Sequence, residues 1–219
     1  MILLIDTAQE ISTIALSDSG RVLFTVENSI INDTASWLHP AVVRLLKAAG
    51  LNIRALEAVA VVAGPGSYTG LRVGMAAAKG FCYALKIPLI TQNTLRVMAN
   101  SMQTLSQERG AQISPMIDAR RNEVYTALYR EDGRELLSPR AMILDKNSFE
   151  KELSINRIVF FGTGAKKWEK INVSTNALFC EQQNGIQAFA ELATEDFDLK
   201  NWADPVFTEP VYLKEFFSY

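Results

Sequence analysis

The feature that most constrains this chain is a short pattern that occurs twice, near its start and again past its middle. Ile5-Asp6 ends the first apolar run, and Ile117-Asp118 ends a similar run in the second half. After eight intervening residues each copy reads Ala-Leu, at 15–16 and at 127–128. Both copies predict a strand, a tight turn and a second strand. These pairs are common, so chance similarity is the alternative; a duplicated half-domain also explains the shared strand order.

Apolar periodicity predicts the elements of the first half, in which strands alternate with helices. A helix closed by Gly50 follows three strands, and a glycine-rich loop connects a buried strand to the next helix. The predicted ranges are strands at 2–6, 12–17 and 21–27, a helix at 35–49, a strand at 58–63, a loop at 64–70, a helix to 85, a strand at 88–91 and a helix to about 108.

The second half repeats this plan in degenerate form. Its predicted ranges are strands at 113–118, 123–129 and 134–141, a short helix, a strand at 158–161, a Gly-Thr-Gly turn at 162–164 and a helix at 186–195. We therefore predict an α/β fold of two duplicated βββαβα lobes, the second one degenerate. The lobes are expected at residues 1–110 and 111–200, with a C-terminal segment at 201–219 that packs back on the first lobe.

Composition excludes several classes of protein. With 219 residues, of which 48% are hydrophobic and 21% charged, the chain can bury a large core. It has no run of about 18 to 20 apolar residues and no leader-like start, so we expect a cytoplasmic protein that does not enter a membrane. Cys82 and Cys180 lie in apolar surroundings, which predicts buried, reduced thiols and no disulfide or metal framework.

The charge balance argues against a strong nucleic-acid binder. The formal net charge is −2, and the longest basic runs are pairs such as Arg120-Arg121 and Lys166-Lys167. Phosphate backbones are normally met by a basic face, so we do not expect this chain alone to bind nucleic acid strongly.

The loop at residues 64–70 can face an anion, because it joins a strand to the start of a helix. It is not a Walker loop, since Leu71-Arg72 follow Gly70, and its glycine spacing differs from the dinucleotide fingerprint. Ser67 does not form a nucleophile elbow, because the flanking glycines are missing. The alternative is a structural turn that lets a helix pack tightly on a strand.

Other candidate catalytic groups are few. His39 is the only histidine, which excludes a two-histidine metal site and favours a packed or surface residue. Asp6 and Asp118 end central strands, where an actin-like kinase places carboxylates that hold Mg²⁺ through water. Such a kinase needs glycine directly after the aspartate, so that the backbone can approach the phosphates. Here Thr7-Ala8 follow Asp6, and Ala119-Arg120 follow Asp118. We expect weak or absent nucleotide binding by this chain.

The helix after the loop has a face of small residues at spacings of three and four. These residues are Val73, Ala76, Ala77, Gly80 and Ala84. Such a face suits either close packing on the chain's own sheet or docking of a partner helix.

Several of these motifs resemble those of the TsaB (also called YeaZ) family, whose members are relatives of the TsaD enzyme. The resemblance rests on residues 5–8, Leu38-His39-Pro40, the segment 64–74, residues 117–120 with 123–125, and residues 210–213. It implies an actin-like (ASKHA, ribonuclease H-like) fold and a part in making N6-threonylcarbamoyladenosine beside the anticodon of tRNAs that read codons beginning with A. TsaD-like enzymes carry a His-x-x-x-His metal pair where this chain has residues 91–96, which contain no histidine.

The resemblance therefore implies a non-catalytic subunit, with ATP and metal on the partner enzymes and no metal or cofactor here. It implies a heterodimer with TsaD, a ternary complex with TsaE, tRNA contact only through the complex, and a homodimer when the chain is alone. The expected partner-binding residues are Leu38, Val42, Leu45, Arg72, Val73, Ala76, Ala77 and Gly80. A vestigial phosphate region is expected at Asp6, Thr7, Gly64, Gly66, Ser67, Thr69 and Asp118. The alternatives are an independent actin-like kinase or a metal-independent peptidase.

Overall fold

The computed structural model describes residues 1–30, 33–103, 110–182 and 184–214, which form two compact units. Unit 1 comprises residues 1–97 and 185–211, and unit 2 comprises residues 98–184 and the chain from Tyr212 onward. The predicted lobes follow chain order, so residues 186–198 fall within the expected second lobe. In the structure these residues form the helix α6 (Ile186–Asp198), which lies in unit 1. Its apolar side chains pack on the sheet of unit 1, which is why chain order and compactness differ.

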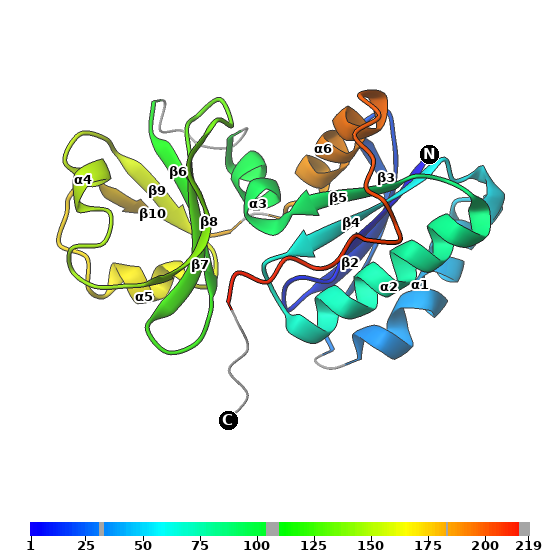
Figure 1. Ribbon diagram of the computed structural model, residues 1–219, viewed down its shortest axis with the longest axis horizontal. Helices are drawn as coiled ribbons and strands as arrows, with labels where there is room; N and C mark the ends of the chain where they lie inside the picture. Colours follow the sequence, from blue (N-terminus) through cyan, green and yellow to red (C-terminus); the bar gives the residue numbers. More distant parts are fainter. Residues whose placement is uncertain (31–32, 104–109, 183, 215–219) are drawn as a thin grey trace. The chain divides into compact units, whose positions relative to one another are not determined.

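Unit 1 is built on a five-stranded sheet in the order β3-β2-β1-β4-β5 (Figure 1). The strand β1 pairs antiparallel with β2 and parallel with β4, so it lies at the centre of a mixed sheet. The strands are β1 (Ile2–Asp6), β2 (Ser12–Asp18), β3 (Arg21–Asn28), β4 (Ala58–Gly64) and β5 (Leu89–Asn93).

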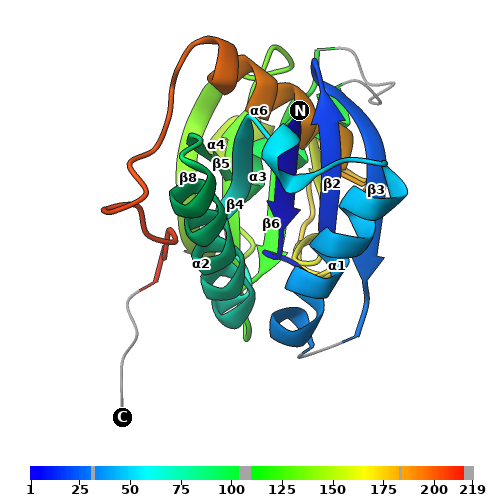
Figure 2. The same cartoon turned by 90° about the vertical axis from the view of Figure 1, so that its right-hand side faces the viewer.

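Helices cover both faces of this sheet. Along β1, Leu3 and Ile5 belong to the core beneath α1 (Thr34–Ala48) and α2 (Tyr68–Leu85), whereas Leu4 belongs to the core beneath α6. This alternation follows from the two-residue period of a strand, and every one of these side chains is buried. Figure 2 shows α1 and α2 side by side in front of the sheet.

The helix ends agree with the sequence signals. Gly50 follows α1 with a φ of +66°, and its N–H donates to the carbonyl oxygen of Lys47. The N–H of Leu51 donates to Leu46, which completes a Schellman motif. The helix α3 is described as Thr94–Gln103; its predicted continuation to about 108 lies outside the described residues.

Unit 2 repeats the sheet of unit 1. Its order, β8-β7-β6-β9-β10, is that of β3-β2-β1-β4-β5 strand for strand, and the pairings have the same directions. The predicted duplication is thus confirmed. The strands are β6 (Gln112–Asp118), β7 (Glu123–Tyr129), β8 (Glu135–Ile143), β9 (Ile158–Phe161) and β10 (Ala177–Phe179).

The core of unit 2 is rich in aromatic rings. Phe160 on β9 makes an edge contact with Trp168 on α5 (Ala165–Glu169), with ring centroids 6.1 Å apart. Phe149, which precedes α4 (Glu150–Leu153), contacts both rings. These large apolar surfaces supply much of the burial that stabilises a small unit.

The segment after α6 runs back along unit 1. Ala203 donates its N–H to the carbonyl oxygen of Leu89, 2.8 Å away, and Val211 donates to Ala63 at 2.7 Å. The last predicted residues of this segment, 215–219, lie outside the described part of the chain. Within the described residues, no helix has the length and apolar content to cross a bilayer.

Candidate functional site

The glycine-rich loop lies against the turn that follows β1. The hydroxyl of Thr7 donates to the carbonyl oxygen of Gly70 at 2.7 Å, and the N–H of Ser67 donates to the carbonyl oxygen of Ala8 at 2.7 Å. Thr7 and Ala8 are buried as a result. These bonds tie the first turn of α2 to the end of the central strand.

Three glycines make this approach possible. A Cβ atom on Gly70 would lie 2.0 Å from the carbonyl oxygen of Thr7, and one on Gly66 would lie 2.2 Å from that of Ala8. A Cβ on Gly74 would lie 2.3 Å from the hydroxyl oxygen of Thr7. Contacts this short are impossible, so these positions accept only glycine. The geometry supports the structural-turn interpretation of the loop.

An actin-like fold implies a nucleotide whose phosphates approach this region, and the residues present do not fit it. Three N–H groups of this region already have acceptors within the chain: Ser67 donates to the Ala8 carbonyl, Gly70 to the hydroxyl oxygen of Ser67, and Leu71 to the Ser67 carbonyl. The Ala8 N–H is bound to the Asp6 carboxylate. Thr69 is exposed in the first turn of α2. The N–H groups of Ala8, Ser67, Gly70 and Leu71 are therefore not free to bind a phosphate.

The two strand-end aspartates differ in their electrostatics. Burial raises the pKa of the Asp6 carboxyl to about 6, although the hydrogen bond from the Ala8 N–H opposes the rise. Partial burial also acts to raise the pKa of Asp118, but the hydrogen bond and charge of Lys167, with the N–H and charge of Arg120, lower it below its ordinary value. The lysine Nζ lies 2.7 Å from Asp118 Oδ1. One aspartate is therefore desolvated and the other has a built-in counter-ion.

The expected partner-binding residues on α1 are in the core. Leu38, Val42 and Leu45 are all at most 1% exposed and pack with β1 and β2. Because they face the sheet, they hold the helix in place and cannot contact a partner while this packing persists. Their helical period marks the buried stripe of α1, not its outer face.

The expected residues on α2 divide between the two sides of the helix. Ala77 is buried and Val73 is partly buried against the same core, whereas Arg72, Ala76 and Gly80 are exposed. A Cβ atom added to Gly80 would meet nothing within 4 Å. Nothing in the described chain thus requires glycine at this position, in contrast to the glycines near Thr7.

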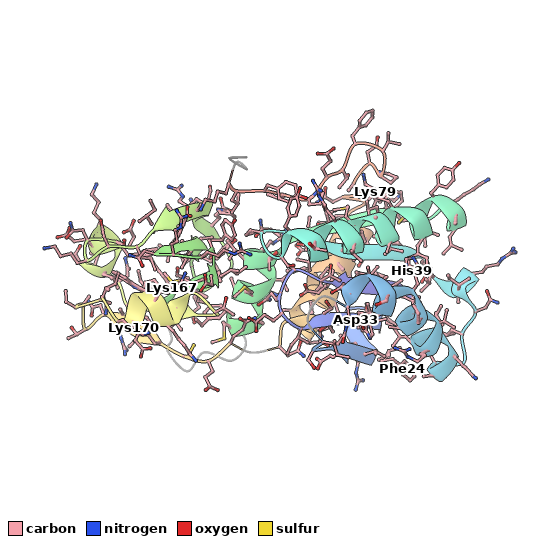
Figure 3. All side chains as sticks on the ribbon, turned by 90° about the horizontal axis from the view of Figure 1, so that it is seen from below. Phe24, Asp33, His39, Lys79, Lys167 and Lys170 are labelled. Atoms are coloured by element: carbon pink, nitrogen blue, oxygen red, sulfur yellow. The ribbon has the colours of Figure 1, made fainter. Side chains whose placement is uncertain are left out.

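Periodicity did not identify the apolar residues on the outer side of these helices. Val43 on α1 is 66% exposed and Tyr83 on α2 is 87% exposed. The His39 ring lies 5.5 Å from that of Phe81, so the two helices meet along this side (Figure 3). We call the set His39, Val43, Ala76, Gly80 and Tyr83 the α1–α2 face. At the start of α2, the Arg72 guanidinium lies 4.0 Å from the centroid of the Tyr68 ring.

Catalytic and metal-binding groups are sparse. Among the described residues no three side chains of His, Cys, Asp or Glu gather in a way that could hold a metal. Cys82 is buried, which raises the pKa of its thiol to about 11. Cys180 is exposed, so the prediction of burial is wrong for this thiol. It follows the three-residue strand β10, which lies at the edge of its sheet.

Comparison with known proteins identifies relatives. Residues 29–184 match the model of the family described as "TsaD: tRNA N6-adenosine threonylcarbamoyltransferase". The chain is 29% identical to the tRNA threonylcarbamoyladenosine biosynthesis protein TsaB of Escherichia coli, over 97% of this chain and 94% of that protein.

Solved structures give the same result. YeaZ from Pseudomonas aeruginosa is 25% identical and superposes with a TM-score of 0.77, over 97% of this chain and 99% of that one. The activator of the 2-hydroxyisocaproyl-CoA dehydratase from Clostridium difficile, at 9% identity and a TM-score of 0.51 over 91% and 95% of the two chains, shares the fold alone. Together with the duplicated sheets, these similarities confirm the predicted actin-like α/β fold. The chain belongs to the family that the TsaD model describes, on its TsaB (YeaZ) branch.

Proposed function

We propose that this chain is a non-catalytic subunit in tRNA threonylcarbamoyladenosine biosynthesis, and that it acts by binding a TsaD-type enzyme. The similarity to a TsaB protein of tRNA threonylcarbamoyladenosine biosynthesis and the family match support the pathway. The engaged N–H groups of Ser67, Gly70 and Leu71 and the lack of a histidine pair in residues 91–96 support a role without chemistry of its own. The partner enzyme then supplies the ATP and metal sites.

The α1–α2 face is the proposed contact surface, and Gly80 is the observation that carries the proposal. Gly80 is exposed, lies inside a helix where glycine lowers stability, and has open space where its side chain would be. Ala76, one turn earlier, is also exposed and small. The two helices also expose large apolar side chains, Val43 on α1 and Tyr83 on α2. Small residues on an exposed helix surface suit the close approach of a partner helix.

In this role the chain stabilises the enzyme in a conformation that can transfer threonylcarbamoyl to the adenosine beside the anticodon of tRNAs reading codons that begin with A. A TsaE-type ATPase joins the complex, and tRNA is contacted within it. When the enzyme is absent, a second copy of the chain can cover the same face.

Light scattering after size-exclusion chromatography, with TsaD from the same organism, tests the proposal. The wild-type chain should co-elute with TsaD as a heterodimer, and modification of tRNA by TsaD should depend on it. Gly80→Leu should remove co-elution while the chain remains folded. The matched control is Asp198→Leu, which places the same side chain at an exposed position of α6, on the other face of the sheet. Equal TsaD binding by the wild type and Gly80→Leu would overturn the proposed surface; full modification without the chain would overturn the role.

A further inference from the structure

The fold brings together two basic pairs that are far apart in the sequence. Arg120-Arg121 form the turn between β6 and β7, and Lys166-Lys167 lie in α5. The N–H of Asp118 donates to Thr163 Oγ1 at 3.0 Å, which places the start of α5 beside this turn. Lys167 then reaches Asp118 Oδ1 at 2.7 Å and the carbonyl oxygen of Glu123 at 3.3 Å. The fold thus brings basic residues that are far apart in the sequence together at one end of the sheet of unit 2.

Two acidic side chains at this end are already paired with lysines. Asp118 forms an ion pair with Lys167, and Glu123 forms one with Lys214. Lys170 follows Lys167 by three residues, directly after the C-terminal end of α5, and Figure 3 labels both lysines beside this helix. We call this set the basic patch: Arg120, Arg121, Lys166, Lys167, Lys170 and Lys214. Within the described residues of the turn and of α5, only Glu169 adds a further negative charge.

The backbone of the turn indicates that the arginines have a role outside the fold. Arg120 and Arg121 have φ values of +69° and +50°, a left-handed conformation that glycine or asparagine adopts more readily. Both side chains are exposed, and the Arg120 carbonyl accepts the turn's hydrogen bond from the N–H of Glu123. Packing therefore does not require arginine at these positions. Residues kept at a cost in backbone strain often serve function.

We propose that the basic patch binds the phosphate backbone of RNA, and so adds contacts to tRNA within the complex described above. The inference rests on the proposed function, which supplies a tRNA substrate. Lys167 is partly buried and the other cations of the patch are exposed. They come from three separate segments of the chain, so they can meet several phosphates along an extended backbone. Positive charge complements this polyanion, although the whole chain carries a net charge of −2. The patch acts as an additional surface of the heterodimer.

The test uses the heterodimer of the full chain with TsaD and fluorescently labelled, unmodified tRNA, with binding measured by anisotropy over a series of salt concentrations. One variant is Arg120→Asn with Arg121→Gly, which removes two charges and relieves the strained turn. A second is Lys166→Ala with Lys170→Ala. The matched control is Arg134→Ala with Lys151→Ala, two exposed cations of the same unit outside the patch. Each patch variant should bind tRNA roughly tenfold more weakly, with a salt slope reduced by one to two, and the control should match the wild type.

Thermal melting separates this role from a structural one. The variant with Arg120→Asn and Arg121→Gly should melt at or above the melting temperature of the wild type, while its affinity for tRNA falls. Unchanged tRNA affinity in a heterodimer that still forms would overturn the inference and leave the proposed function standing. Absence of a heterodimer with the wild-type chain would instead overturn the proposed function and the inference that rests on it. If the variants lose binding of ATP or inorganic triphosphate but not of tRNA, the patch serves a small phosphate ligand and the RNA inference is wrong.

Discussion

The hydroxyl of Thr7 donates to the carbonyl oxygen of Gly70, 2.7 Å away and 63 residues later in the chain. This bond joins the turn after the central strand to the helix that carries the proposed contact surface. The glycines around it are required by the fold, whereas Gly80, at an exposed position further along the same helix, is not. Two kinds of glycine in one helix can therefore be told apart by experiment.

Gly70→Ala and Gly80→Ala should have opposite effects on stability. At position 70 the new methyl group would overlap the Thr7 carbonyl oxygen, so unfolding free energy should fall by about 3 kcal/mol or more. At position 80 the methyl group meets nothing, and the better helix propensity of alanine should raise it by about 1 kcal/mol. Urea unfolding of both variants checks this. Equal destabilisation by the two changes would show that the space at Gly80 is not open.

Asp6→Asn should change the pH dependence of stability. The folded pKa of about 6 lies above the ordinary value, so the native state binds more protons between about pH 4 and 6. Stability of the wild type therefore falls as pH rises through this window. Asparagine keeps an oxygen for the Ala8 N–H and does not ionise. Between pH 4 and pH 8, the free energy of unfolding of the variant relative to that of the wild type should therefore rise by about 1 to 3 kcal/mol.

Unfolding curves at several pH values test this expectation. A wild type and variant whose stabilities differ by the same amount at pH 4 and pH 8 would show that Asp6 titrates as it does in the unfolded chain.

Lys167→Met should raise the pKa of the Asp118 carboxyl, because it removes the largest influence that lowers it. The lowered pKa means that the pair stabilises the native state above about pH 4 and that this contribution is lost as pH falls. Asp118 is 43% exposed, so water screens the pair and the gain is small. NMR titration of the carboxyl carbon measures the shift. Lys170→Met, which leaves the ion pair between Lys167 and Asp118 intact, is the control and should change the pKa of Asp118 much less.

Gln92→Leu should be more destabilising than Gln187→Leu. Both glutamines connect α6 to the sheet of unit 1, but Gln92 is buried and donates to the Asp196 carboxylate, whereas Gln187 bonds to Gly20 and Val22 near the surface. Loss of a buried donor leaves the carboxylate with fewer partners and should cost about 2 kcal/mol. Water replaces the bonds of Gln187, so that change should cost less than about 1 kcal/mol. Denaturant midpoints of the two variants provide the comparison, and the reverse order would contradict it.

The sheets could be predicted from sequence because their strands carry strong alternation and their glycines mark the turns. The strand β1 was expected at its observed bounds, and Gly50 does end α1. The three residues of β10 and the five of α5 were not predicted, since such short segments carry too little periodicity. The placement of α6 with unit 1 depends on which sheet Phe189 packs against, and chain order does not reveal this.

The surfaces were harder to predict than the fold. Helical spacing identified Leu38 and Val42 as an apolar stripe, and the structure shows that this stripe is the buried one. Val43, one residue further along, carries the exposed apolar surface. Likewise, a basic pair at 120–121 and another at 166–167 look unremarkable in the sequence, because only strand pairing between β6 and β9 brings their segments to one end of a sheet.

The assignment of α6 to unit 1 has a consequence for folding during synthesis. Unit 1 is made of two pieces of chain, and the whole of unit 2 up to residue 184 lies between them. As the polypeptide leaves the ribosome, Ile2, Leu4 and Ala60 on one face of the first sheet lack the apolar side chains of α6 until residues 186–198 emerge. The N-terminal unit therefore completes its core last, and the nascent chain exposes an apolar sheet face through most of translation.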